Sequence, residues 1–288
     1  MFNKKARNSF YGWLWNLIAL FIILFPISSL ILGAIQTEAS LLTDVRNPLP
    51  TAVTLQNFTV LITGNVSNTS YPTQVEDFPL AFLNSTIVSL SVTLLTLVFG
   101  SFSAYSLARL RFPGKNSYSF AVLATRMVPV IALVIPLFLS FRRFGLLNTL
   151  PGIIIAETGF LLPFVIWLLR AYFETLPHEL EDAARVDGCT RFRAFLQIVI
   201  PLSTPGLAAT FVITFLLSWN ELLIPITLAS QKQVQTLPVM LSSLFSDYSL
   251  QYSVVNATAL LALTPTVILA LLLQKYVVAG LTAGALKG

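Results

Sequence analysis

The chain has 288 residues, of which 56% are hydrophobic and only 10% are charged, and its mean hydropathy is +0.81. Because soluble domains carry about 25% charged residues, this composition excludes an ordinary soluble domain and predicts an all-α polytopic membrane protein. The net charge of +5 raises the question of nucleic-acid binding. Basic residues that flank membrane helices explain this charge better, so we expect membrane lipid and no nucleic acid as a partner.

Residues with metal-binding or catalytic chemistry are scarce. The chain has one cysteine, Cys189, and one histidine, His178. A single cysteine excludes an internal disulfide or a cysteine metal cluster, and a single histidine argues against a histidine metal site. The apolar runs contain no carboxylate cluster, so we expect neither a metal ion nor the catalytic constellation of a membrane enzyme.

The chain begins with a basic segment, 1–12, and an uncharged run then continues to Gln36. About 20 apolar residues are enough to span a membrane, so the run predicts a first helix over 13–35. This run is too long for a signal peptide, and we expect it to be retained as a span. Residues 36–79 are richer in polar residues and prolines, which predicts an extracytoplasmic loop.

Three further apolar runs predict membrane helices over 82–108, 119–140 and 151–171. Pro129 and Pro163 lie inside the last two of these helices. Proline removes a backbone donor, so we expect kinks or breaks there. In transporters such breaks often flank the substrate path, although local packing adjustment explains them equally well.

Residues 174–201 form a polar, charged segment between apolar neighbours. Glu181 and Arg185 are four residues apart in the favourable acid-first order, which predicts a helix with an ion pair on its surface. Gly188 is expected to end this helix and to form a sharp turn. A second helix is expected to follow and to end at Pro201. Such a helix–turn–helix should lie in water, where it can dock on another protein.

Two more apolar runs complete the chain. They predict helices over 204–228 and 253–276, joined by a polar loop over 229–252 and followed by a tail over 277–288. We therefore expect residues 1–288 to form a single transmembrane domain of six helices.

Six spans place both termini on one side of the membrane. Twelve of the seventeen basic residues fall in segments on that side, four fall on the other, and Arg126 falls within a span. Basic residues concentrate in cytoplasmic loops. The bias predicts that both termini and residues 174–201 are cytoplasmic and that residues 36–79 lie outside.

The polar segment carries an acid followed by two alanines, a glycine and an Ile-x-aliphatic-Pro ending, each at a fixed spacing. The residues are Asp182, Ala183, Ala184, Gly188, Ile198, Ile200 and Pro201. This pattern resembles the signature of ATP-binding-cassette importer permeases, with Asp182 where the family usually has glutamate. Stretches such as Asn84-Ser85 and Ser218-Trp219-Asn220-Glu221 are similar to the carbohydrate-uptake branch, and in particular to the smaller permease of maltose-type transporters.

The resemblance implies a multi-subunit importer in the bacterial cytoplasmic (inner) membrane. A second permease would pair with this chain, a dimer of ATPase subunits would bind beneath the pair, and an extracytoplasmic solute-binding protein would deliver a sugar. ATP and Mg²⁺ would bind to the ATPase. This chain contains no G-x-x-x-x-G-K-[ST] phosphate loop, so we expect it to bind no cofactor and to hydrolyse no ATP.

The resemblance also implies that 174–201 is the coupling loop that docks on the ATPase. Its small alanines would allow close approach, and Asp182 would pair with a base on the ATPase. The residues expected to take part in coupling are Glu181, Asp182, Ala183, Ala184, Arg185, Gly188, Ile198 and Pro201.

Three charged residues fall inside the predicted spans, namely Arg126, Glu157 and Glu221. Charges in a membrane are costly and usually face a cavity or one another. One hypothesis is that Glu221 and Asn220 line the solute path beside the stacking face of Trp219. The other is structural, with Arg126 paired to Glu157 or to Glu221.

The sequence thus predicts the permease subunit of an ATP-driven sugar importer that forms half of the translocation path. The same machinery with a polyol, a glycosylated osmolyte or a glycerophosphate-type solute is the first alternative. An ion-coupled secondary transporter, for which Glu157 and Glu221 supply acidic groups, is the second. A carrier that works alone has no use for an ATPase-docking loop, which argues against this second alternative.

Overall fold

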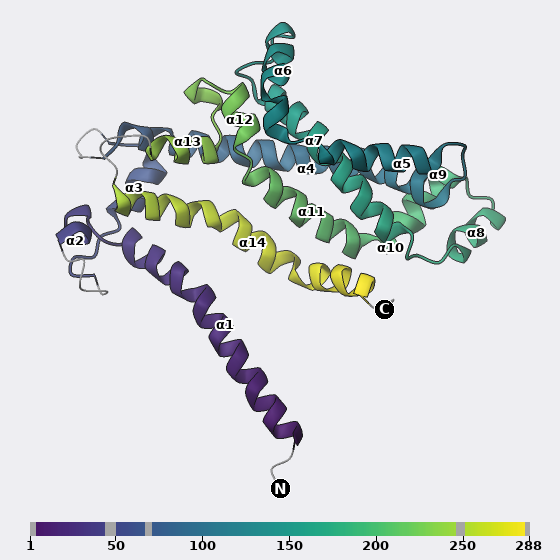
Figure 1. Ribbon diagram of the computed structural model, residues 1–288, viewed down its shortest axis with the longest axis horizontal. Coiled ribbons are helices and arrows are strands. Elements are labelled where there is room, and N and C mark those ends of the chain that lie inside the picture. Colours follow the sequence, from purple (N-terminus) through teal and green to yellow (C-terminus); the bar gives the residue numbers. More distant parts are fainter. Residues whose placement is uncertain (1–3, 44–49, 67–70, 246–250, 286–288) are drawn as a thin grey trace. The chain divides into compact units, whose positions relative to one another are not determined.

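The structure is a computed structural model, and every regular element that it describes is a helix apart from one isolated antiparallel bridge between Gln36 and Val53. Four helices are long and apolar enough to cross a membrane, or six if each of two bent helix pairs is one span. The predicted all-α polytopic membrane fold is confirmed. The described residues are 4–43, 50–66, 71–245 and 251–285, with side chains described only from 12 to 275 (Figure 1).

The chain folds as two compact units. The first comprises residues 1–79 and 241–264, and the second comprises residues 80–240 and 265–288. The predicted coupling segment and the charged residues of the predicted spans all belong to the second unit.

The first unit contains α1, the short helices that follow it, and the beginning of α14. These elements are α1 (Lys4–Ala34), α2 (Glu38–Thr43), α3 (Gln56–Thr63), the 3₁₀ turn η1 (Thr73–Asp77) and α14 (Tyr252–Ala285). The segment predicted as a loop over 36–79 is therefore largely helical where it is described. Helix α14 also continues through residues 277–285 of the predicted tail, whereas residues 286–288 lie outside the described part of the chain.

Polar side chains of the 36–79 segment form hydrogen bonds with backbone groups at two helix ends in this unit. The amide of Asn57 donates to the carbonyls of Ala34, at 2.8 Å, and of Gln36, at 2.9 Å, where α1 ends. The Glu38 carboxylate accepts from the amides of Tyr252, at 3.1 Å, and Ser253, at 2.9 Å, where α14 begins. Helix ends leave backbone groups unpaired, and a negative charge suits a helix N-terminus, so both contacts stabilise the segment.

The second unit is built on two long helices, α4 (Phe78–Arg109), which begins just inside the first unit, and α7 (Leu150–Phe173). The remaining elements are α5 (Lys115–Ala124), η2 (Thr125–Met127), α6 (Val130–Arg143), α8 (Glu179–Val186), α9 (Arg191–Ala194), the π-helix η3 (Phe195–Val199), α10 (Ile200–Leu202), α11 (Thr204–Trp219), α12 (Leu223–Leu228) and η4 (Lys232–Val234). The beginning of α13 (Leu237–Leu244), up to Met240, and the part of α14 from Pro265 onward also belong to this unit.

Two apolar clusters form the core of this unit, and α4 and α7 contribute to both. The first includes Val88 and Ile153 with Ile224 of α12. The second includes Leu169 and Phe173 with Phe195 of the π-helix. At the start of α4, the buried Asn84 donates to the carbonyls of Gln233 and Gln235, both at 3.0 Å, which fixes the segment after α12.

Two predicted spans are broken. The predicted helix over 119–140 is two segments, Lys115–Met127 and Val130–Arg143, that meet at 93°. Val128, immediately before Pro129, has an extended backbone because a following proline disfavours the helical conformation. The predicted helix over 204–228 stops at Trp219 and resumes as α12. Another bend, of 75°, separates Arg191–Leu202 from Thr204–Trp219.

Gly206, in the first turn of α11, allows a close approach to α7. A Cβ atom built there would lie 2.4 Å from the ring of Tyr172. The missing side chain therefore sets the distance between these two helices.

We expect Gly206→Ala to lower stability by about 1–3 kcal/mol, because the added methyl group must displace the Tyr172 ring. Thermal unfolding of the detergent-solubilised complex measures this change. Gly12→Ala is the matched control, because a Cβ at Gly12 of α1 meets nothing within 4 Å. Equal unfolding temperatures for the two variants would contradict the close-packing argument.

Candidate functional site

Helix α8 carries the acidic half of the predicted coupling segment and ends in a regular cap. The Gly188 amide donates to the Arg185 carbonyl at 3.1 Å, and the Cys189 amide donates to the Ala184 carbonyl at 2.9 Å. Gly188 has a φ of +89°. This is the Schellman arrangement, in which a left-handed residue, usually glycine, closes the helix. The predicted turn at Gly188 has this structural basis.

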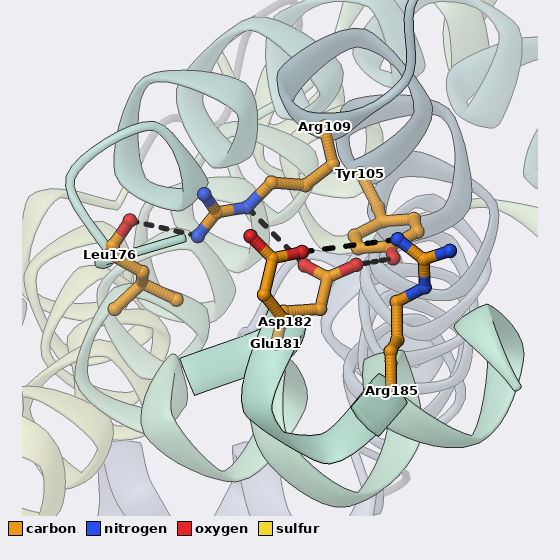
Figure 2. Close-up of polar contacts among 6 residues, drawn as sticks. All are labelled: Tyr105, Arg109, Leu176, Glu181, Asp182 and Arg185. Atoms are coloured by element: carbon orange, nitrogen blue, oxygen red, sulfur yellow. Dashed lines mark hydrogen bonds and ion pairs between the residues drawn. The ribbon is translucent and has the colours of Figure 1, made fainter. Parts of the chain in front are cut away.

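The side chain of Glu181 points inward to the end of α4 (Figure 2). Its carboxylate accepts a hydrogen bond from the Tyr105 hydroxyl and lies 3.6 Å from Nε of Arg109. Arg109 also donates from Nη2 to the carbonyl of Leu176, at 2.9 Å, in the segment that leads into α8. The side chains of Arg109 and Glu181 are only 3% and 9% exposed. This buried cluster fastens α8 to a long apolar helix.

The predicted pairing of Glu181 with Arg185 is not formed. Arg185 instead pairs with Asp182 at 3.8 Å, and both side chains are exposed (Figure 2). Tertiary packing explains this difference. Of the two acids within reach of Arg185, Glu181 points toward Arg109, and Asp182 remains on the outer surface.

The outer surface of α8 is partly apolar. Leu180 and Val186 are 46% and 87% exposed, and the small Ala183 lies between them and is also exposed. Residues three apart share a helix face, so these side chains form one strip. An exposed apolar strip on a helix that is otherwise charged indicates a surface for another protein.

The second arm of the segment begins at Thr190, whose hydroxyl accepts from the Arg193 amide at 3.3 Å. It then passes from α9 through the π-helix to α10, which contains Pro201. Ile198, inside the π-helix, is half-buried, whereas Pro201 is exposed. Single π-turns are frequent at functional sites.

Glu157 lies in the middle of α7 and is 1% exposed. Its Oε2 atom accepts a hydrogen bond of 2.5 Å from the hydroxyl of Ser218 on α11. Its other oxygen is buried and has no hydrogen-bond partner among the described residues. A buried carboxylate oxygen without a donor is costly and is available to a bound molecule.

The predicted ion pair between Arg126 and Glu157 is not formed in this structure. Arg126 donates from Nη1 to the carbonyl of Phe160 at 2.9 Å and lies over the ring of Phe164, 5.7 Å from its centroid. The guanidinium is held by α7 one to two turns beyond Glu157, and α7 continues as a helix through Pro163, where the sequence predicted a kink or break. Local backbone and aromatic partners have replaced the predicted charge partner.

The residues of the predicted solute path have separate environments. Trp219 is 3% exposed and packs on Phe82 and Phe215. Asn220 is exposed and donates to the carbonyl of Leu216 at 2.8 Å. Glu221 accepts from the amides of Leu223, at 2.9 Å, and Ile224, at 3.3 Å, at the start of α12. Glu221 also lines a cavity.

That cavity has a volume of about 150 Å³ and brings Glu221 together with Arg126 and Glu157. A larger pocket of about 690 Å³ shares Arg126, Val130 and Phe160 with it and is otherwise lined mainly by apolar residues of α6 and α7. The two carboxylates can accept hydrogen bonds and the guanidinium can donate them. Within the described ranges, no three His, Cys, Asp and Glu side chains gather as a metal site.

Sequence reasoning missed Tyr105 and Arg109, which hold Glu181. They lie four residues apart near the end of α4 and therefore share one face of that helix. Their partner is more than seventy residues away in the chain. The only signal in the sequence was that Arg109 follows an apolar run, and this position is equally typical of an interfacial residue.

Comparisons with known proteins agree with this fold. Residues 96–282 match the family described as binding-protein-dependent transport system inner membrane component. The trehalose transport system permease protein SugB of Mycobacterium tuberculosis is 36% identical over 83% of this chain and 84% of its own length. The sulfoquinovosyl glycerol transport system permease protein SmoH of Agrobacterium fabrum is 33% identical over 92% of this chain and 89% of its own length.

A solved structure has the same fold. It is described as a bacterial ABC transporter involved in the import of the acidic polysaccharide alginate, and the match has a TM-score of 0.77. The match covers 96% of this chain and 99% of that one, at 23% identity. The family match and the two relatives, together with the shared fold, show that the chain is a member of the binding-protein-dependent transport system inner membrane component family, the permease subunits of ABC importers.

Proposed function

We propose that this chain forms half of the translocation path of a sugar importer and couples it to a separate ATPase through residues 174–201. The observation that carries the proposal is the construction of α8. One side of this helix is fixed internally through Glu181, and the other exposes the strip of Leu180, Ala183 and Val186. A rigid helix with an unpartnered apolar surface is suited to transmit the motion of a docked protein.

The proposed complex contains a second permease, a dimer of ATPase subunits and an extracytoplasmic solute-binding protein. ATP and Mg²⁺ bind to the ATPase, since this chain has no phosphate-binding glycine loop. The distribution of basic residues supports cytoplasmic termini and a cytoplasmic α8, the side on which ATP is available.

A sugar or sugar glycoside is the proposed cargo. SugB is named for trehalose and SmoH for a glycosylated glycerol, which keeps the glycosylated solute as the second candidate. Both classes carry several hydroxyl groups. The oxygen of Glu157 that has no partner and the carboxylate of Glu221 could accept hydrogen bonds from such groups as the solute passes.

The function is tested with the complete complex in proteoliposomes, supplied with its binding protein and a panel of sugars and glycosides. ATP hydrolysis and solute uptake should rise together for one member of the panel. Uptake that continues without the ATPase and stops when an ionophore collapses the ion gradient would instead establish an ion-coupled carrier.

Val186→Asp tests the docking strip. Val186 is 87% exposed, so the permease should fold normally. A charge in a close apolar contact is costly, and we expect the ATPase to be lost when the permease is purified. The amount of ATPase that copurifies is the measurement.

Val53→Asp is the matched control, because Val53 is 66% exposed and lies in the segment that the sequence places on the outside. It should retain the ATPase. If Val186→Asp retained as much ATPase as Val53→Asp, α8 would not be the docking surface.

Gly188→Ala tests whether the turn geometry matters for coupling. Alanine at a φ of +89° costs about 1–2 kcal/mol although a Cβ there meets no neighbour. We expect solute uptake per ATP hydrolysed to fall several-fold. Gly145→Ala introduces the same kind of strain, at a φ of +69° and also in open space, outside the coupling segment. An equal loss of coupling in both variants would mean that general destabilisation, and not the turn at Gly188, causes the effect.

Glu157→Gln tests the cavity. The amide keeps an acceptor for Ser218 but replaces the second oxygen with a donor, and a buried group left without its partner costs about 1–3 kcal/mol. We expect solute uptake to fall about tenfold with the complex intact. The control is Glu76→Gln, which removes an exposed carboxylate from the 36–79 segment, outside the coupling segment and the cavity. Uptake as high as that of the control would exclude Glu157 from the solute path.

A further inference from the structure

A basic pocket lies where the apolar helix α4 ends. Its volume is about 510 Å³, and it is lined by Arg109, Leu110, Arg111, Phe112 and Arg191. A second pocket of about 440 Å³ shares Arg111 and Phe112 with it and adds Lys115 of α5. The two hollows therefore form one continuous basic region between the α4–α5 turn and α9.

The cations of this region are poorly neutralised within the chain. Arg109 faces Glu181, but its Nη1 atom is buried and has no hydrogen-bond partner in the described part of the chain. Among the described residues, Arg111, Lys115 and Arg191 form no ion pair. The region thus contains four cations, of which only Arg109 has a carboxylate partner among the described residues. A buried donor without an acceptor, beside unpaired cations, indicates that an anion completes the site.

The apolar surroundings indicate what kind of molecule carries that anion. Phe102 lies two turns before Arg109 on the same side of α4, and its ring stacks on Phe192 with centroids 6.2 Å apart. The two rings are 42% and 60% exposed. Arg191 and Phe192 are neighbours on α9, so this short helix contributes both a cation to the pocket and a ring to the apolar surface.

We propose that this pocket binds the phosphate headgroup of an anionic phospholipid, with the Phe102–Phe192 pair against its acyl chains. Basic pockets at the cytoplasmic ends of membrane helices bind such headgroups. A small soluble anion would satisfy the cations but would leave the two rings in water, whereas a phospholipid has both a phosphate and an apolar part. The proposal relies on the cytoplasmic orientation of α4 proposed above.

The bound lipid would bridge the α4–α5 turn to α9, which is the second arm of the coupling segment. Arg109 connects the pocket to α8, because its side chain lines the pocket and also forms an ion pair with Glu181 of α8. Occupancy of the pocket would therefore stiffen the support of α8, and coupled ATP hydrolysis should depend on anionic lipid.

The test uses the complete complex in nanodiscs of phosphatidylcholine, with and without phosphatidylglycerol. Lipid retained by the complex is measured by native mass spectrometry, and ATP hydrolysis is measured in parallel. The wild type should retain phosphatidylglycerol and hydrolyse ATP faster with it. Arg111→Gln and Arg191→Gln should each weaken retention about fivefold, since a basic residue near the membrane surface contributes about 1 kcal/mol. Arg109 is left intact, because its loss would also release Glu181.

Arg142→Gln, which removes an exposed arginine from the end of α6, is the control and should retain lipid as the wild type does. Equal retention in all variants would overturn the proposal. Binding of soluble glycerol phosphate as tightly as phosphatidylglycerol would also overturn it, because the acyl chains would then add nothing and the pocket would be a site for free phosphate. Loss of the ATPase from the Arg111 and Arg191 variants without any change in lipid retention would assign these arginines to protein docking. Lipid retention needs no ATPase, so this readout is independent of the docking experiment on Val186.

Discussion

The position of α8 depends on one buried carboxylate, that of Glu181. A charge removed from water must be paired, and breaking such a pair from one side costs about 3–5 kcal/mol. Arg109 and Tyr105 supply the partners, and both lie near the end of α4. The proposed coupling segment is therefore linked to the apolar helix through side chains as well as through the chain itself. In the proposed coupling, these contacts would pass a displacement of α8 to α4.

The same need to satisfy polar groups explains where the other charges of the apolar region lie. Arg126 and Glu221 are each close to a helix end or bend, whereas Glu157 lies inside the continuous helix α7. Arg126 precedes the bend at Pro129 and binds a carbonyl of α7 near Pro163, and Glu221 caps α12 after α11 has ended. Broken helices free backbone donors and acceptors that a membrane cannot satisfy. The charges stabilise these breaks, and the breaks bring the charges to one cavity.

Local signals in the sequence were sufficient for part of this arrangement. Gly188 predicted the turn and the spacing of Glu181 and Arg185 predicted the helix, because both signals depend on residues that are neighbours in the chain. The partner of Arg185 was mistaken, because Glu181 and Asp182 are both within reach along the helix and only packing on α4 separates them. The bend at Pro129 was expected as a kink, but its size of 93° was not predictable, since it depends on how α6 packs on α12. No local pattern in the sequence indicates the contact between Tyr105 and Glu181.

The membrane orientation was predicted by counting all basic residues alike. In the structure, these residues have different environments and partners. Arg109 is an internal partner with a side chain that is 3% exposed, and Arg185 forms an exposed pair on the outer surface of α8. Arg111 and Arg191 line a pocket without an ion pair in the described residues. In the proposed orientation, Arg111 and Arg191 would lie at the cytoplasmic membrane surface, within reach of anionic headgroups. Arg109, which lines the same pocket, would then link this surface to the proposed coupling helix through Glu181.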